Sequence, residues 1–205
     1  MTPQIKICGI TNLDDARLAV DLGADMLGFI FYAKSQRGIA RDDAAAICQA
    51  LPASVERVGV FVNEAEPVIR EILAACKLTA LQFHGDEPAS FCRRFPALKI
   101  KAIRVRNADS LRMAAEYDVD ALVLDTSTDP HRGGTGKTFD WSLAVQAKSL
   151  GRPIILSGGL TPDNVSEAIR VVQPFAVDVA SGVEHEPGKK DPEKLRRFIE
   201  ACKSE

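Results

Sequence analysis

A cysteine and an aspartate end two short apolar runs of the chain, because Cys8 is the last of residues 4–8 and Asp125 is the last of residues 121–125. Side chains alternate between the two faces of a strand, so Cys8 shares a face with Lys6 while the β-branched neighbours face the other way. A thiolate and a carboxylic acid at one cavity could act as a general base and a general acid. Taken singly, Cys8 also fits a small buried apolar residue, and Asp125 fits a helix-cap or loop carboxylate.

Two glycine turns follow the last two apolar runs and predict an anion site. One contains Gly158 and Gly159, and the other contains Ser181 and Gly182. Glycines at such turns allow backbone N–H groups to approach a phosphate closely, and many α/β barrels bind phosphate after their seventh and eighth strands. Ordinary tight turns are the alternative interpretation.

Two further side chains are candidates for ligand contacts. Arg37 lies in a loop after the second apolar run, and its guanidinium suits bidentate pairing with a carboxylate. A surface arginine is the alternative. His84 ends the fourth run, where it could contact a ligand or be an ordinary histidine of the rim, and the sequence leaves these open.

The longest irregular segment, residues 126–140, is rich in Gly, Thr, Ser, Asp and Pro. Its Gly-Gly-Thr-Gly-Lys-Thr stretch resembles a nucleotide-binding P-loop but fails the spacing, because position 131 holds His131 where the motif requires glycine. A long glycine-containing loop in a compact fold is more often functional, so we expect residues 126–137 to form a mobile lid over a ligand.

These residues need elements to position them, and the hydrophobic pattern predicts eight strands alternating with eight helices. The predicted strands cover residues 4–8, 25–31, 57–62, 80–84, 100–105, 121–125, 153–157 and 175–180. The predicted helices cover residues 12–22, 42–51, 66–76, 87–95, 108–116, 142–150, 164–172 and 192–202. This order predicts a single-domain (β/α)₈ TIM barrel over residues 1–205, with a doubly wound open sheet as the alternative. In the barrel, alternation also points Lys6 and Asp178 inward from neighbouring strands, which predicts an ion pair.

Composition limits the classes of protein to consider. The chain has 205 residues, a formal net charge of −2 and 46% hydrophobic residues, and it shows no clustered basic surface for nucleic acid or an anionic membrane. Five widely spaced cysteines without a C-x-x-C pair argue against a disulfide framework or a zinc site. With no signal peptide and no apolar run long enough to cross a bilayer, we expect a cytoplasmic protein.

Taken together, the sequence resembles the phosphoribosylanthranilate isomerase family of tryptophan biosynthesis over essentially the whole chain. The stretches that carry the resemblance are residues 6–11, 28–31, 82–85, 124–126, 133–141, 156–160 and 180–184. Lys-Ile-Cys-Gly near the start and Gly-Gly-Thr-Gly-Lys after the sixth strand are the specific motifs. The chain departs from the family at Gln36, where the family usually has proline.

The resemblance implies an Amadori rearrangement of N-(5-phosphoribosyl)anthranilate, with Cys8 as general base and Asp125 as general acid. It implies a substrate-binding set comprising Arg37, His84, Gly134, Gly158, Gly159, Ser181 and Gly182. The only partner implied is this phosphorylated sugar–anthranilate substrate. No cofactor or metal is expected, because the substrate's own iminium acts as electron sink. Lys6 is a candidate for lowering the pKa of Cys8.

Two other interpretations remain. The chain could be a different sugar-phosphate isomerase or epimerase of the phosphate-binding barrels, although metal-dependent members need more histidines than the three present. A barrel serving only for binding or assembly would need no reactive thiol. The oligomeric state does not follow from the sequence.

Overall fold

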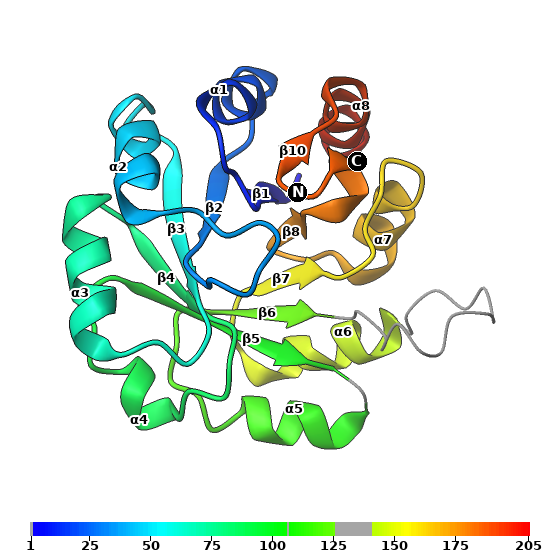
Figure 1. Ribbon diagram of the computed structural model, residues 1–205. Coiled ribbons are helices and arrows are strands. Elements are labelled where there is room, and N and C mark those ends of the chain that lie inside the picture. Colours follow the sequence, from blue (N-terminus) through cyan, green and yellow to red (C-terminus); the bar gives the residue numbers. More distant parts are fainter. Residues whose placement is uncertain (1, 106, 126–140) are drawn as a thin grey trace.

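The computed structural model describes residues 2–105, 107–125 and 141–205. Its centre is a closed barrel of eight parallel strands in sequence order (Figure 1). The strands are β1 (Gln4–Cys8), β2 (Met26–Ile30), β3 (Glu56–Phe61), β4 (Ala80–Phe83), β5 (Leu98–Arg104), β6 (Ala121–Asp125), β7 (Ile154–Ser157) and β8 (Ala176–Val179). β1 pairs with both β2 and β8, so the barrel is closed and the open doubly wound sheet is excluded.

Helices surround the barrel on the outside (Figure 1). They are α1 (Leu13–Leu22), α2 (Arg41–Gln49), α3 (Glu66–Ala75), α4 (Ala89–Cys92), α5 (Ala108–Ala114), α6 (Trp141–Ala147), α7 (Val165–Val172) and α8 (Pro192–Lys203). The 3₁₀ helix η2 (Lys148–Leu150) extends α6 and η3 (Ser181–Val183) follows β8. The expected boundary signals are present at α1, where the Asn12 side chain accepts a hydrogen bond from Asp15 N and Gly23 adopts a left-handed conformation.

The fourth helix is much shorter than the predicted segment 87–95. Pro88 is the N-cap of α4, and a residue before proline is disfavoured in the helical region, so Glu87 stays outside the helix. Its carboxylate instead accepts hydrogen bonds from the backbone N–H groups of Asn63 and Gly85 and pairs with Lys101 at 2.9 Å. Glu87 thus fastens two loops at the carboxyl ends of β3 and β4.

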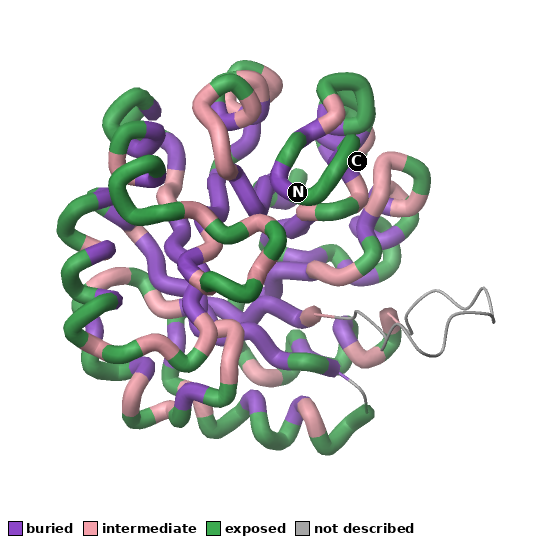
Figure 2. The backbone as a smooth tube through the Cα atoms, in the orientation of Figure 1, coloured by how far each residue is buried: buried purple, intermediate pink, exposed green. Residues whose placement is uncertain are grey.

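Two hydrophobic regions stabilise the fold. The larger lies between the strands and the helices, and the smaller fills the barrel interior with side chains such as Met26, Val58, Ile100, Val123 and Ile155. Figure 2 shows the strands buried over most of their length, while the helices expose their outer faces. Above the apolar interior, towards the carboxyl ends of the strands, the inward-facing side chains become polar, which defines the end of the barrel where the site lies.

The sequence interpretation missed a two-stranded antiparallel hairpin between η3 and α8. It consists of β9 (Glu184–Glu186) and β10 (Lys189–Lys190), joined at Gly188 with φ of 83°. Figure 1 shows β10 between α1 and α8, next to the barrel opening. Strands this short carry no detectable alternation, so the segment reads from sequence as a loop.

Candidate active site

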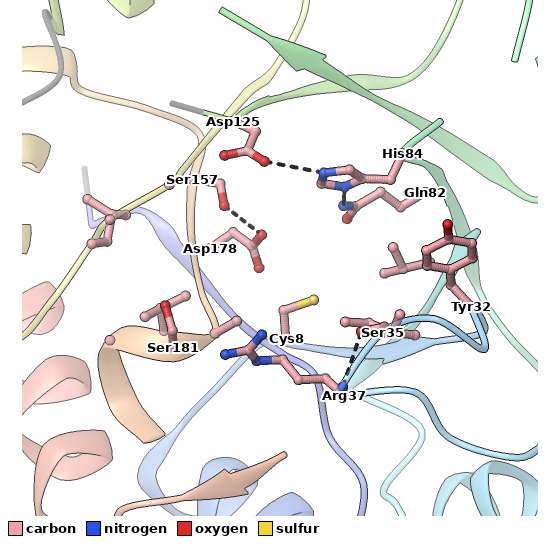
Figure 3. A pocket seen from close by; sticks show the side chains of 18 of the residues that line it. Cys8, Tyr32, Ser35, Arg37, Gln82, His84, Asp125, Ser157, Asp178 and Ser181 are labelled. Carbon is pink, nitrogen blue, oxygen red and sulfur yellow. Dashed lines mark hydrogen bonds and ion pairs between the residues drawn. The ribbon is translucent and has the colours of Figure 1, made fainter. Parts of the chain in front are cut away.

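One cavity of about 360 Å³ opens at the carboxyl ends of the strands and contains every described site residue expected from the sequence (Figure 3). These residues are Cys8, Arg37, His84, Asp125, Gly158, Gly159, Ser181 and Gly182. Its wall also includes residues that were not expected at the site, among them Tyr32, Gln82, Ser157 and Asp178. The expected Gly134, and the expected lid at 126–137, lie outside the described residues.

Cys8 sits at the end of β1, directly above a buried ion pair. Lys6 Nζ lies 2.9 Å from Asp178 Oδ1, with the Lys6 side chain fully buried and the Asp178 side chain 7% exposed. This contact confirms the predicted pair. Gly28 on β2 provides the space, because a Cβ there would lie 2.8 Å from Cys8 Sγ and 3.0 Å from Lys6 Nζ. The second carboxylate oxygen of Asp178 accepts a hydrogen bond from Ser157 Oγ at 3.0 Å.

The pKa of the Cys8 thiol does not shift in the direction expected from the sequence. Burial disfavours the thiolate and raises the pKa of Cys8 above its usual value, while Lys6 lowers it and Asp178 raises it. Lys6 therefore lies next to Cys8 as expected, but its lowering of the Cys8 pKa is partly cancelled by Asp178, the partner of Lys6. Burial therefore favours the neutral form of the Cys8 thiol over the thiolate.

Asp125, at the end of β6, lies in a chain of hydrogen bonds. His84 Nε2 is 3.3 Å from Asp125 Oδ2, and Gln82 Nε2 is 3.0 Å from His84 Nδ1. With the Gln82 amide assigned as donor to Nδ1, the imidazole proton resides on Nε2 and is donated to the Asp125 carboxylate. This arrangement orients Asp125 toward the cavity from the side facing Cys8 (Figure 3).

The Arg37 guanidinium already has a protein partner. Its Nε lies 2.8 Å from Glu184 Oε1 and its Nη2 lies 2.6 Å from Glu184 Oε2, and these hydrogen bonds raise the pKa of Arg37 further. The backbone preceding Arg37 is held without the family's proline, since Arg37 N donates to Ser35 Oγ at 3.1 Å. Arg37 nevertheless lines the cavity, so the simple surface arginine is excluded.

The two glycine turns lie together on one wall of the cavity. Gly158 and Gly159 have φ values of 88° and 69°, which favour glycine, and a Cβ on Gly159 would meet nothing within 4 Å. Gly182 is required for a different reason, because a Cβ there would overlap the carbonyl oxygen of Leu160. The turn after β7 is fixed by Asn164, whose Nδ2 donates to Gly159 O at 3.0 Å.

Two residues near the cavity were not predicted from the sequence, because their contacts are with residues far away along the chain. Glu184 meets Arg37 across 147 positions, and Lys190 Nζ reaches the carbonyl oxygen of Cys8 across 182 positions. The only available signal was the inclusion of Glu184 in the stretch 180–184. Among the residues that the structure describes, no group of three His, Cys, Asp or Glu is placed to hold a metal ion. Over the same residues, no helix is long and apolar enough to cross a membrane.

Comparisons with known proteins match both the sequence and the fold of this chain. A family model for N-(5'phosphoribosyl)anthranilate (PRA) isomerase matches residues 5–201. The N-(5'-phosphoribosyl)anthranilate isomerase of Trichlorobacter lovleyi is 48% identical over 200 residues, covering 98% of each chain. The crystal structure of the phosphoribosyl anthranilate isomerase of Thermotoga maritima superposes with a TM-score of 0.91 at 47% identity, over 99% of this chain and 100% of that one.

A further crystal structure of phosphoribosyl anthranilate isomerase matches with a TM-score of 0.89 and 45% identity, over 99% of this chain and 100% of that one. That enzyme is in complex with reduced 1-(o-carboxyphenylamino)-1-deoxyribulose 5-phosphate. With a family model over nearly its whole length and relatives near 48% identity, the chain belongs to the N-(5'-phosphoribosyl)anthranilate isomerase family.

Proposed function

We propose that the protein converts N-(5-phosphoribosyl)anthranilate to 1-(2-carboxyphenylamino)-1-deoxyribulose 5-phosphate, with Cys8 as general base and Asp125 as general acid. One observation carries the proposal. A thiol and a carboxyl group from different strands line a single cavity that also contains an arginine and two glycine turns. A phosphorylated, carboxylated substrate that must gain one proton and lose another requires all four features.

In the first step, Asp125 in its protonated, carboxylic acid form donates a proton to the ribose ring oxygen and is left as the carboxylate. The bond between that oxygen and C1 breaks, and the nitrogen lone pair forms a Schiff base with C1. His84 supports this step, because a hydrogen bond between its Nε2 and Asp125 Oδ2 stabilises the carboxylate left after proton transfer.

In the second step, the Cys8 thiolate removes the proton from C2. The electron pair of the C2–H bond moves into the conjugated iminium, giving an enolamine, which tautomerises to the 1-deoxyribulose product. The reaction is an isomerisation, so no oxidant or reductant is consumed.

Thiolate formation depends on the substrate. Burial favours the neutral form of Cys8 in the free protein, but the iminium of the opened sugar brings a positive charge close to the thiol. A nearby positive charge favours the thiolate, in the same direction as Lys6. Cys8 releases its proton to solvent after ring opening, and the resulting thiolate then accepts the proton from C2.

The ends of the substrate are bound by different parts of the cavity. Arg37 pairs with the anthranilate carboxylate, while Gly158, Gly159, Ser181 and Gly182 provide the wall for the phosphate. The glycine turns suit an anion because they can present backbone N–H groups without side chains in the way.

The test is turnover of N-(5-phosphoribosyl)anthranilate by the purified protein, followed by loss of substrate fluorescence. We expect saturable turnover without added metal or cofactor, and unchanged rates in the presence of a chelator. Absence of turnover, together with turnover of another sugar phosphate, would assign the cavity to a different isomerase or epimerase and contradict the proposal.

A further inference from the structure

The hairpin between η3 and α8 carries two buried charged residues that the reaction itself does not use. The side chain of Glu184 is 4% exposed and that of Lys190 is fully buried, and their Oε1 and Nζ atoms lie 3.0 Å apart. Neither residue lines the cavity. Burying two charges is costly, so their contacts indicate what the arrangement provides.

The hydrogen bonds of the Glu184 carboxylate hold several parts of the mouth of the barrel. Oε1 accepts from Arg37 Nε at 2.8 Å and from Gly188 N at 3.3 Å, and Oε2 accepts from Arg37 Nη2 at 2.6 Å. The carboxylate therefore occupies one edge of the Arg37 guanidinium. Within the described part of the chain, no hydrogen bond involves Arg37 Nη1, which leaves the opposite edge for an anion.

The stem of Arg37 is confined from the other side. Gly9 has φ of 75°, and a Cβ there would lie 2.9 Å from Arg37 Cδ, so the side chain passes directly over the Gly9 backbone. Glu184 at the head and Gly9 under the stem together fix one orientation of the guanidinium. Figure 3 shows this guanidinium extending along the cavity wall from the Arg37 loop toward Ser181.

Lys190 joins the same carboxylate to the strand end that carries the thiol. Its Nζ donates to Cys8 O at 2.6 Å and to Ala180 O at 3.4 Å, in addition to Glu184. One carboxylate is thus shared by two cations. The group as a whole keeps a positive charge, and Arg37 is the member that reaches the cavity.

We propose that Glu184 and Lys190 are positioning residues of this site. Glu184 orients Arg37 toward the carboxylate of the anthranilate ring, and Lys190 holds Glu184 while fixing the end of β1 below Cys8. The inference rests on the proposed function, because it takes Arg37 as the group that binds the ring carboxylate.

The test compares Glu184→Gln with the parent protein, using reduced 1-(o-carboxyphenylamino)-1-deoxyribulose 5-phosphate and the same compound without its ring carboxylate. We expect Glu184→Gln to weaken binding of the carboxylated compound roughly tenfold, which is the lower range for the loss of a hydrogen bond to a charged group. Binding of the compound without the ring carboxylate should weaken less than twofold. In turnover, KM should rise by a similar factor while kcat changes little.

A second arm separates positioning from general destabilisation. In an Arg37→Ala background, Glu184→Gln should produce no further loss of affinity, because its effect passes through Arg37. Equal losses in both backgrounds, equal losses for both compounds, or tighter binding by Glu184→Gln would each overturn the inference. The last result would make Glu184 a competitor of the substrate carboxylate.

Glu184→Gln leaves the buried Lys190 and the partly exposed Arg37 with a weakened partner, so a second variant tests the same roles if the single variant misfolds. Glu184→Gln/Lys190→Met removes one charge of each sign, and it should both raise KM and lower kcat, since the Cys8 carbonyl also loses its donor. A double variant with unchanged kcat would refute the role of Lys190. Failure of the proposed function is distinguishable from all these results, because the parent protein would then show no turnover of phosphoribosylanthranilate.

Discussion

The buried pair beneath Cys8 gives the sharpest test of how the thiol is controlled. Lys6 and Asp178 form an ion pair at 2.9 Å, with side-chain exposures of 0% and 7%. Removing either partner leaves an uncompensated buried charge, which costs about 3–5 kcal/mol. For a chain of this size that loss corresponds to a fall in Tm of roughly 6–20 °C. Lys6→Met and Asp178→Asn should each show it in thermal or urea unfolding, and the double variant should lose less than the sum.

The two single variants should move the pKa of Cys8 in opposite directions. Burial raises the thiol pKa, Lys6 lowers it and Asp178 raises it. Asp178→Asn removes the carboxylate that disfavours the thiolate and leaves Lys6 next to Cys8, so the thiol pKa should fall below that of the parent. Lys6→Met should raise it. The measurement is the pH dependence of alkylation of Cys8 by iodoacetamide, followed by mass spectrometry of the Cys8 peptide.

Lys101→Met is the matched control. Lys101 forms an ion pair with Glu87 at the same distance of 2.9 Å, with both side chains 3% exposed, but it lies outside the cavity. Its loss should destabilise the protein to a similar degree and leave the pH profile of Cys8 alkylation unchanged. If Lys6→Met and Asp178→Asn shift the profile in the same direction, or if Lys101→Met shifts it as well, local charge does not set the pKa of the thiol.

Other predictions concern the anion sites and pH. Gly159→Ala should raise KM well above the KM of Gly151→Ala, while the two variants lose similar stability. Both glycines have φ near 70° and open surroundings, but only Gly159 lines the cavity. Equal KM values in the two variants would remove the phosphate assignment. Arg37→Ala should lose about 1.5–3 kcal/mol of affinity for carboxylated ligands in calorimetric titration and nothing for ligands without the carboxylate, and parallel losses would make Arg37 structural. Burial opposes ionisation of Glu184, but Arg37 and Lys190 outweigh it and hold its pKa below the usual 4.5. Its contribution to stability is therefore present above pH 4.5 and is lost as pH falls, so the unfolding free energies of the parent and Glu184→Gln should converge in acid, and a constant gap would contradict this.

Alternation along the strands was sufficient to predict the main features of the cavity. It turned Lys6 and Cys8 inward on β1 and Asp178 inward on β8, and the ion pair between Lys6 and Asp178 is confirmed. The eight apolar runs also predicted the closed barrel, because each is short, regular and followed by a helical pattern. These features depend on local periodicity, which a single sequence records directly.

Features that depend on distant contacts could not be predicted in the same way. The pairing of Arg37 with Glu184 requires the hairpin of β9 and β10, whose strands are too short for a recognisable pattern. The direction of the Cys8 pKa shift depends on the balance between burial and the charges of Lys6, Asp178 and Lys190, and only the three-dimensional arrangement provides that balance. The start of the fourth predicted helix was placed too early for a local reason, the proline at position 88.

The most direct test of the proposed chemistry is the kcat of Cys8→Ala with phosphoribosylanthranilate. Loss of a general base typically costs about 10²- to 10⁴-fold, and the substitution removes only a sulfur atom and its proton. We predict a fall in kcat of at least that order, with KM and the thermal unfolding of the protein close to those of the parent. A folded Cys8→Ala protein that keeps most of its turnover would contradict the role of Cys8 as the base.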